Sequence, residues 1–144
     1  MNYGYLCNEI QHFSAMAKIT VQNTQITVLQ WAEQDYISLT DMASAKEGDS
    51  RSADIIKNWI RNRYTIEFLG TWEVIHNPNF KVVEFDHFRK SAGLPSFVLS
   101  ASEWIECTSA IGLVVKKGRY GGTYAHKDIA FEFGSAISVP FKLY

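Results

Sequence analysis

Polar and apolar residues alternate over residues 18–21 and again over residues 25–29, and both stretches are rich in Thr, Val and Ile. Alternation of β-branched residues is typical of strands that have one buried face. Asn23 and Thr24, which separate the two stretches, favour a turn. The pattern therefore predicts a β-hairpin.

A helical period follows in residues 53–62. Lys57 and Arg61 lie four residues apart and share the polar face of the predicted helix. Gly70 leaves open whether residues 64–72 extend this helix or are interrupted. The side chains that form the apolar face of residues 53–62 are Ile55, Ile56, Trp59 and Ile60.

Shorter helices are predicted from capping and stop signals. Ser38 or Thr40 can cap a short helix whose first turn carries Asp41, a favourable charge at that end. Residues 81–85 fit either a strand or the start of a helix. Residues 86–92 fit a short helix that the following Gly and Pro bring to an end.

The second half of the chain contains a capping box at residues 100–103, S-A-S-E, which opens a helix. We expect this helix to end at Gly112 and to be followed by a short strand at residues 113–115. A glycine-rich connection at residues 118–123 then leads into a last helix over residues 124–136. The side chains assigned to the core are Trp59, Trp72, Trp104, Ile129, Ala130, Phe131, Phe133 and Ala136.

The composition fits one globular domain, since 144 residues that are 47% apolar and 14% aromatic can fill a core. Residues 1–17 have no clear period, and we expect an N-terminal arm there, ahead of a domain over residues 18–144. No apolar run is long enough to cross a bilayer, and the N-terminus lacks a signal-peptide pattern. Cys7 and Cys107 make neither a disulfide framework nor a zinc site, which favours a cytoplasmic protein.

Charge is unevenly distributed although the net charge is only −1. Residues 107–127 contain no Asp or Glu but carry four cations, and residues 51–63 carry four cations against one acid, Asp54. Such polarisation is what a surface that docks on a polyanion requires. The cations of the two stretches are Lys116, Lys117, Arg119 and Lys127, and Arg51, Lys57, Arg61 and Arg63.

The stretch V-K-K-G-R-Y-G-G-T-Y-A-H-K-D, residues 115–128, combines the four cations of residues 107–127 with three glycines and two tyrosines. Glycines let a backbone approach a ligand closely, and cations neutralise phosphates. A helix, a strand and a basic turn in succession predict a helix-turn-helix followed by a wing. A solvated hairpin tip has the same composition. The expected DNA contacts are Lys116, Lys117, Arg119, Tyr120, Gly121, Gly122, Thr123, Tyr124, His126 and Lys127, with Lys57, Arg61 and Arg63 from the preceding basic stretch.

Four longer strings carry a resemblance to a known family. They are G-R-Y-G-G-T-Y-A-H-K-D-I-A-F-E-F (residues 118–133), F-K-L-Y (141–144), D-Y-I-S-L-T-D-M-A (35–43) and I-K-N-W-I-R-N-R-Y-T-I-E-F-L-G-T-W-E (56–73). Together they resemble the KilA-N domain of phages, bacteria and large DNA viruses, which is similar to the APSES domains of fungal transcription factors. The resemblance implies a single α+β, winged-helix-like module with a β-hairpin wing, acting in a phage- or prophage-type regulatory protein that binds double-stranded DNA. Gly121 to Tyr124 fall where APSES domains have a Gly-Thr-Trp wing element.

The resemblance leaves the groove helix open. Glu103 and Glu106 lie on the outer face of the helix that precedes the predicted wing, and acids repel phosphates. Either these acids point away from DNA, or the helix over residues 53–62 enters the groove instead.

Two other functions compete with DNA binding. A protein-interaction module of the antirepressor type would use its apolar and tyrosine-rich surface to bind another regulator. A nuclease would need Glu84 and Asp86 on one face of a strand as metal ligands. We find no signature of catalysis or of a cofactor, and His126 with Asp128 is expected to make a hydrogen bond at a helix start, not a metal site. The sequence does not indicate an oligomeric state.

Overall fold

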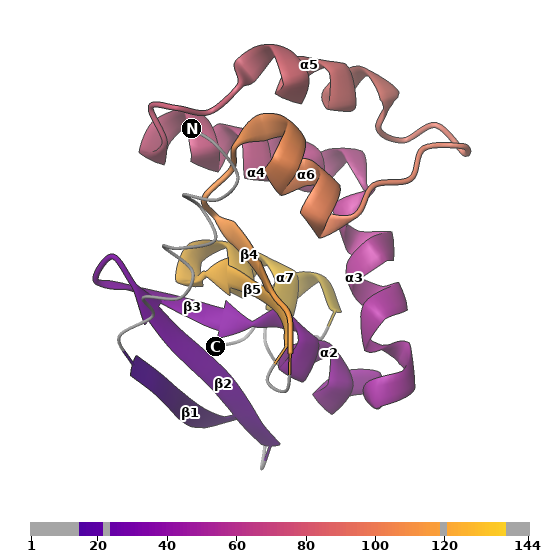
Figure 1. Ribbon diagram of the computed structural model, residues 1–144. Coiled ribbons are helices and arrows are strands. Elements are labelled where there is room, and N and C mark those ends of the chain that lie inside the picture. The colour runs from indigo at the N-terminus through magenta and orange to yellow at the C-terminus, as the bar shows by residue number, and fades with distance from the viewer. Residues whose placement is uncertain (1–14, 22–23, 119–120, 138–144) are drawn as a thin grey trace.

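The computed structural model describes residues 15–21, 24–118 and 121–137, and Figure 1 shows them as an α+β fold around one antiparallel sheet. The strand order is β1-β2-β3-β5-β4. The strands are β1 (Ala15–Val21), β2 (Thr24–Trp31), β3 (Gln34–Ser38), β4 (Leu113–Lys116) and β5 (Gly122–His126). The helices are α2 (Leu39–Glu47), the 3₁₀ turn η1 (Asp49–Arg51), α3 (Ser52–Ile60), α4 (Arg63–His76), α5 (Val82–Ser91), α6 (Ala101–Thr108) and α7 (Lys127–Ile137).

The predicted first hairpin is confirmed, with Lys18 opposite Thr27 in the β1–β2 pair. Its predicted turn residue Asn23 lies outside the described residues. β1 begins at Ala15, so the end of the expected N-terminal arm belongs to the sheet.

β3 was not predicted, and the turn before it explains why. Trp31 pairs with Gln34 across a two-residue loop in which Ala32 and Glu33 have φ of 53° and 63°. Loops of this kind favour Asn and Gly, which tolerate left-handed backbone. Ala and Glu give no such signal, so the sequence hid both the turn and the strand that follows it.

The helix predicted over residues 53–62 is confirmed as α3, with Ile56, Trp59 and Ile60 buried. Residues 63–76 form a separate helix, because the Asn62 side chain accepts a hydrogen bond from the Tyr64 backbone N–H at 2.9 Å and caps α4. Gly70 does not interrupt α4. A Cβ there would lie 2.1 Å from the Phe85 ring, so the glycine permits close packing of α5.

Residues 82–91 form one helix, α5, so of the two alternatives for residues 81–85 the start of a helix is confirmed and the strand is wrong. Glu84 and Asp86 are two residues apart on it and do not share a face. Asp86 forms ion pairs with Arg89 and Lys90, and Glu84 lies 3.8 Å from His87. The shared strand face that a nuclease metal pair would need is therefore absent.

The cap at Ser100 is confirmed, since its hydroxyl accepts from the Glu103 backbone N–H at 3.1 Å. The end predicted at Gly112 is wrong: α6 stops at Thr108, and Ser109 adopts left-handed backbone with φ 58°. The last helix begins at Lys127 and not at residue 124, because residues 122–126 pair as β5.

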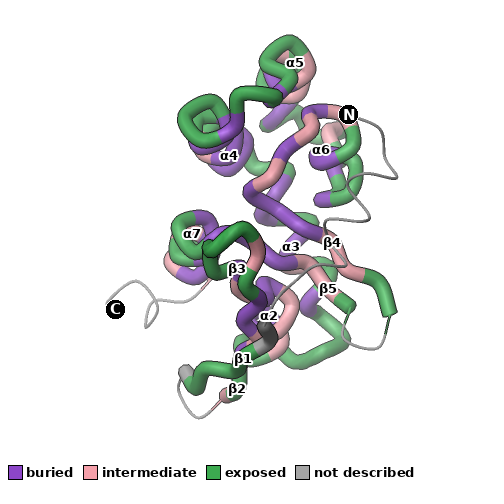
Figure 2. Tube along the Cα trace, turned by 60° about the vertical axis from the view of Figure 1, so that its left-hand side comes forward, coloured by how far each residue is buried: buried purple, intermediate pink, exposed green. Residues whose placement is uncertain are grey.

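The core lies between the sheet and the helices, and Trp104 and Phe133 are fully buried in it. In Figure 2 buried residues lie along β4, β5 and α4, whereas α5 is largely exposed. Two core assignments are wrong, since Phe131 is 60% exposed and Ala136 is also exposed. No helix in the described ranges is long and apolar enough to cross a membrane.

The strained turn at Ala32 and Glu33 yields a stability prediction. We expect Glu33→Gly to raise the free energy of unfolding by about 0.5–1 kcal/mol, because glycine adopts φ 63° without a steric cost. The same replacement at Glu67, inside α4, should lower it by about 1 kcal/mol. Urea unfolding measures both; equal effects at the two sites would contradict the turn assignment.

Candidate nucleic-acid interface

β4 and β5 form a hairpin at the edge of the sheet (Figure 1). Lys116 pairs with Gly122 at the end next to the turn, which we call the tip. The Gly121 N–H donates to the Gly118 carbonyl at 2.9 Å. Gly118 has φ 104°, and a Cβ on Gly121 would lie 2.8 Å from the Gly118 carbonyl oxygen. These two glycines are therefore required by the backbone of the turn.

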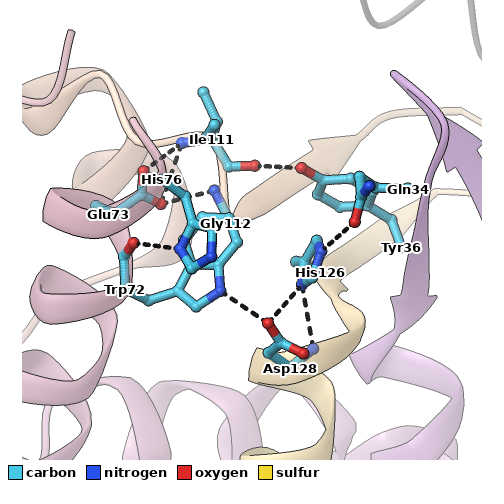
Figure 3. A network of polar contacts seen from close by, with 9 residues as sticks. All are labelled: Gln34, Tyr36, Trp72, Glu73, His76, Ile111, Gly112, His126 and Asp128. Atoms are coloured by element: carbon cyan, nitrogen blue, oxygen red, sulfur yellow. Dashed lines mark hydrogen bonds and ion pairs between the residues drawn. The ribbon is translucent and has the colours of Figure 1, made fainter. Parts of the chain in front are cut away.

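The root of the hairpin is held by a buried carboxylate (Figure 3). Glu73, on α4, is 1% exposed and accepts the N–H groups of Ile111 and Gly112, which precede β4, at 2.6–3.1 Å. The Asn77 side-chain amide donates to it at 2.9 Å. Burial raises the pKa of the Glu73 carboxyl, and these hydrogen bonds act in the opposite direction. The carboxylate thus fixes where the hairpin leaves α6.

Two further contacts close the root from the sheet side. The Tyr36 hydroxyl, on β3, donates to the Ile111 carbonyl at 2.9 Å. The His126 backbone N–H, on β5, donates to the Gly112 carbonyl at 2.8 Å. Burial raises the pKa of Tyr36 far above its usual range, so the hydroxyl keeps its proton and remains a donor.

The His126 imidazole joins β5 to its neighbours (Figure 3). Its Nδ1 accepts from the Asp128 backbone N–H at 3.1 Å, so Nε2 carries the proton and donates to the Gln34 side-chain oxygen at 2.8 Å. Burial lowers the pKa of His126 and keeps the ring neutral. The hydrogen bond expected at a helix start is therefore confirmed. No group of His, Cys, Asp and Glu within the described ranges is arranged to hold a metal ion.

The expected DNA contacts fall into three places. Lys117 is exposed at the hairpin tip, while Lys116 is half-buried one residue earlier. Lys127 is exposed at the far end of β5, which five residues make about 16 Å long. Arg119 and Tyr120 lie outside the described residues. Lys57 on α3, Arg61 just after α3 and Arg63 at the start of α4 are all exposed.

Two expected contacts require correction. Tyr124 is 2% exposed and His126 is 5% exposed, so neither side chain is available to a ligand in this conformation. Both face the interior of the sheet region, where Tyr124 packs with Leu29, Tyr36 and Val114. Their tyrosine and histidine chemistry suggested contact, but Ala125 between them is also buried, so both faces of β5 are covered at this point.

The cations at the tip and on α3 are not neutralised within the described part of the chain. Arg63 forms an ion pair with Glu67 at 3.5 Å. No comparable ion pair with a described residue involves Lys117, Lys57 or Arg61. These three charges are therefore open to an external anion, as is that of the exposed Lys127.

The acids of α6 lie elsewhere. Glu103, Glu106 and Glu84 of α5 surround the half-buried Cys107 thiol, whose pKa is raised by burial and then by these charges. Figure 1 places α6 at the end of β4 that is remote from the hairpin tip. The acids therefore gather away from the tip cations.

The family model of the KilA-N domain matches residues 19–144, nearly the whole chain. This chain belongs to the KilA-N domain family. The KilA-N domain is a DNA-binding type of domain and not an enzyme family. Neither the curated proteins nor the solved structures compared with this KilA-N chain gave a match.

The Glu73 contacts of this KilA-N domain can be tested by substitution. We expect Glu73→Gln to lower the free energy of unfolding by about 1–3 kcal/mol, because an amide NH₂ would face backbone N–H donors. Glu67→Gln, exposed on the same helix, should change it by less than about 0.5 kcal/mol. Equal stabilities for the two variants would exclude a structural role for the carboxylate.

A pH dependence follows from His126. The pKa of His126 lies below the ordinary 6.5 in the folded state. As pH falls, the unfolded chain therefore binds more protons than the folded chain does. The free energy of unfolding should therefore fall as pH drops below 6.5, by up to about 1.4 kcal/mol per pH unit. His126→Asn keeps an acceptor for the Asp128 N–H but does not titrate, so urea unfolding at pH 7.5 to 5.5 should show a shallower decline. Parallel curves for the two proteins would refute this.

Proposed function

We propose that this KilA-N domain binds duplex DNA in a phage- or prophage-type regulatory protein, with the β4–β5 tip against the phosphates and α3 at a groove. The observation that carries the proposal is that cations without an ion pair lie at the tip of a hairpin whose root is fixed, and on a neighbouring helix. Lys117 stands at the tip of that hairpin, Lys57 stands on α3, and Arg61 directly follows α3 as its C-cap. Cations held in place bind phosphates with less ordering cost than cations on a flexible chain.

The choice of α3 as the groove helix rests on charge. The exposed face of α3 carries Lys57 and Asn58, with one acid, Asp54, and the exposed Arg61 follows as the C-cap. Asparagine is a common reader of adenine in the major groove. α6 presents Glu103 and Glu106 instead, which would repel phosphates. The proposal therefore resolves the choice that the sequence leaves open in favour of α3.

The tip is tested with Lys117→Ala in titrations of fluorescent random-sequence duplex DNA at two salt concentrations. We expect weaker binding to all sequences alike, and a plot of log affinity against log salt that is shallower by about 0.9, the effect of losing one phosphate contact. Arg119→Ala should act in the same direction. Lys90→Ala, on α5, is the matched control and should leave affinity unchanged. Wild-type affinity and slope in Lys117→Ala would disprove the tip assignment.

A second candidate function has an observation of its own. Val74 and Ile75 at the end of α4, and Val82 and Val83 at the start of α5, are more than half exposed. Exposed apolar residues grouped in this way are typical of protein-interaction surfaces, as an antirepressor-type module would need. Ile75→Lys should abolish binding of a regulatory protein partner and spare DNA binding. A wild-type protein that fails to bind DNA would favour this candidate.

A further inference from the structure

β3 ends before both of its neighbours in the sheet do. Its last residue, Ser38, pairs with Tyr124 of β5, and Ile37 pairs with Val28 of β2. The chain then turns into α2, while β2 and β5 continue past that point. Beyond these pairs, neither Thr27 of β2 nor Thr123 of β5 is paired with a β3 residue, and their backbone N–H groups need acceptors from elsewhere.

The first turn of α2 supplies the missing acceptors. The Asp41 carboxylate accepts from the Thr27 N–H at 2.8 Å, and the Thr40 hydroxyl accepts from the Thr123 N–H at 3.0 Å. The Ser38 hydroxyl in turn accepts from the Asp41 N–H at 3.0 Å and caps the helix. Side chains of one helical turn thus extend the hydrogen bonding of β3 to both neighbouring strands.

Thr40 meets the hairpin at the point where β5 leaves the sheet. A Cβ on Gly122 would lie 2.8 Å from the Thr40 hydroxyl oxygen and 3.2 Å from its Cβ. Gly122 also has φ 151°, in the region that favours glycine. The residues beyond it lead into the tip, which carries Lys117. A small rotation at Gly122 would therefore move the tip cation by a larger distance.

We propose that Thr40 is a positioning residue for DNA binding, whose hydroxyl holds the β4–β5 hairpin at the angle that presents Lys117 to the phosphates. The assignment rests on the proposed function, since it concerns the same hairpin. Thr40 itself does not touch DNA. Without its hydroxyl the hairpin adopts several angles, and binding must then select one of them, which weakens affinity.

The experiment compares Thr40→Val, which keeps the shape and removes the acceptor, with Thr40→Ser, which keeps the acceptor. Thr71→Val, exposed on α4, is the matched control. In titrations with random-sequence duplex DNA we expect Thr40→Val to weaken binding about 3- to 10-fold, the range of one net hydrogen bond. Thr40→Ser and Thr71→Val should stay within about 2-fold of the wild type.

A double-mutant comparison separates positioning from general stability. In a Lys117→Ala background, Thr40→Val should change affinity by less than about 2-fold, because the cation that it positions is gone. The Thr123 amide should exchange with solvent faster in Thr40→Val while the Ile66 amide of α4 is unchanged. Gly122→Ala, which pushes on Thr40 without removing the hydroxyl, is a second variant if Thr40→Val does not fold, and the same loss of affinity is expected.

Three results would overturn the assignment. Wild-type affinity in Thr40→Val would exclude it while leaving DNA binding intact. Equal losses with and without Lys117 would show that Thr40 contributes only to stability. Absence of DNA binding by the wild type would refute the proposed function and this role with it, and hydrogen exchange at Thr123 would then report the contact alone.

Discussion

The buried carboxylate of Glu73 is the interaction on which the arrangement of this KilA-N domain depends. Burying a carboxylate is costly unless hydrogen bonds replace its water. Here the backbone N–H groups of Ile111 and Gly112 and the amide of Asn77 do so. The donors come from the segment between α6 and β4, so the same bonds that make the charge tolerable also fix the start of the hairpin. The hydrogen bonds that stabilise the buried carboxylate are therefore the same ones that place the hairpin.

Between the Glu73 contacts and the tip, the hairpin is held at two further places. Tyr36 and His126 join its root to β3, and Thr40 meets β5 at Thr123, three residues closer to the tip than His126. Only the turn beyond Gly122 is left without such support among the residues described. A firmly held arm suits an electrostatic contact, because the cation near its end is presented in place.

Local signals in the sequence predicted the first hairpin, α3, the cap of α6 and the buried tryptophans. They failed where a distant partner or an unusual residue decides the structure. Ala32 and Glu33 hid the turn into β3, and residues 124–126 were assigned to a helix because their pairing with β3 and β4 is not a local property. Glu73 could not be found, since Ile111 is 38 residues away, and the partner of Thr40 is 83 residues away. The basic stretches were found because the charge of a side chain can be read directly from the sequence, without knowledge of its neighbours in space.

DNA is proposed to contact α3 and the tip of the β4–β5 hairpin, while the root of that hairpin stays bound to Glu73. Amide chemical-shift mapping with a short random-sequence duplex tests it most directly. The account predicts the largest shifts at residues 117–123 and on the exposed face of α3, with the Ile111 and Gly112 amides unmoved. Shifts concentrated on α5 and α6, or large changes at Ile111 and Gly112, would contradict it.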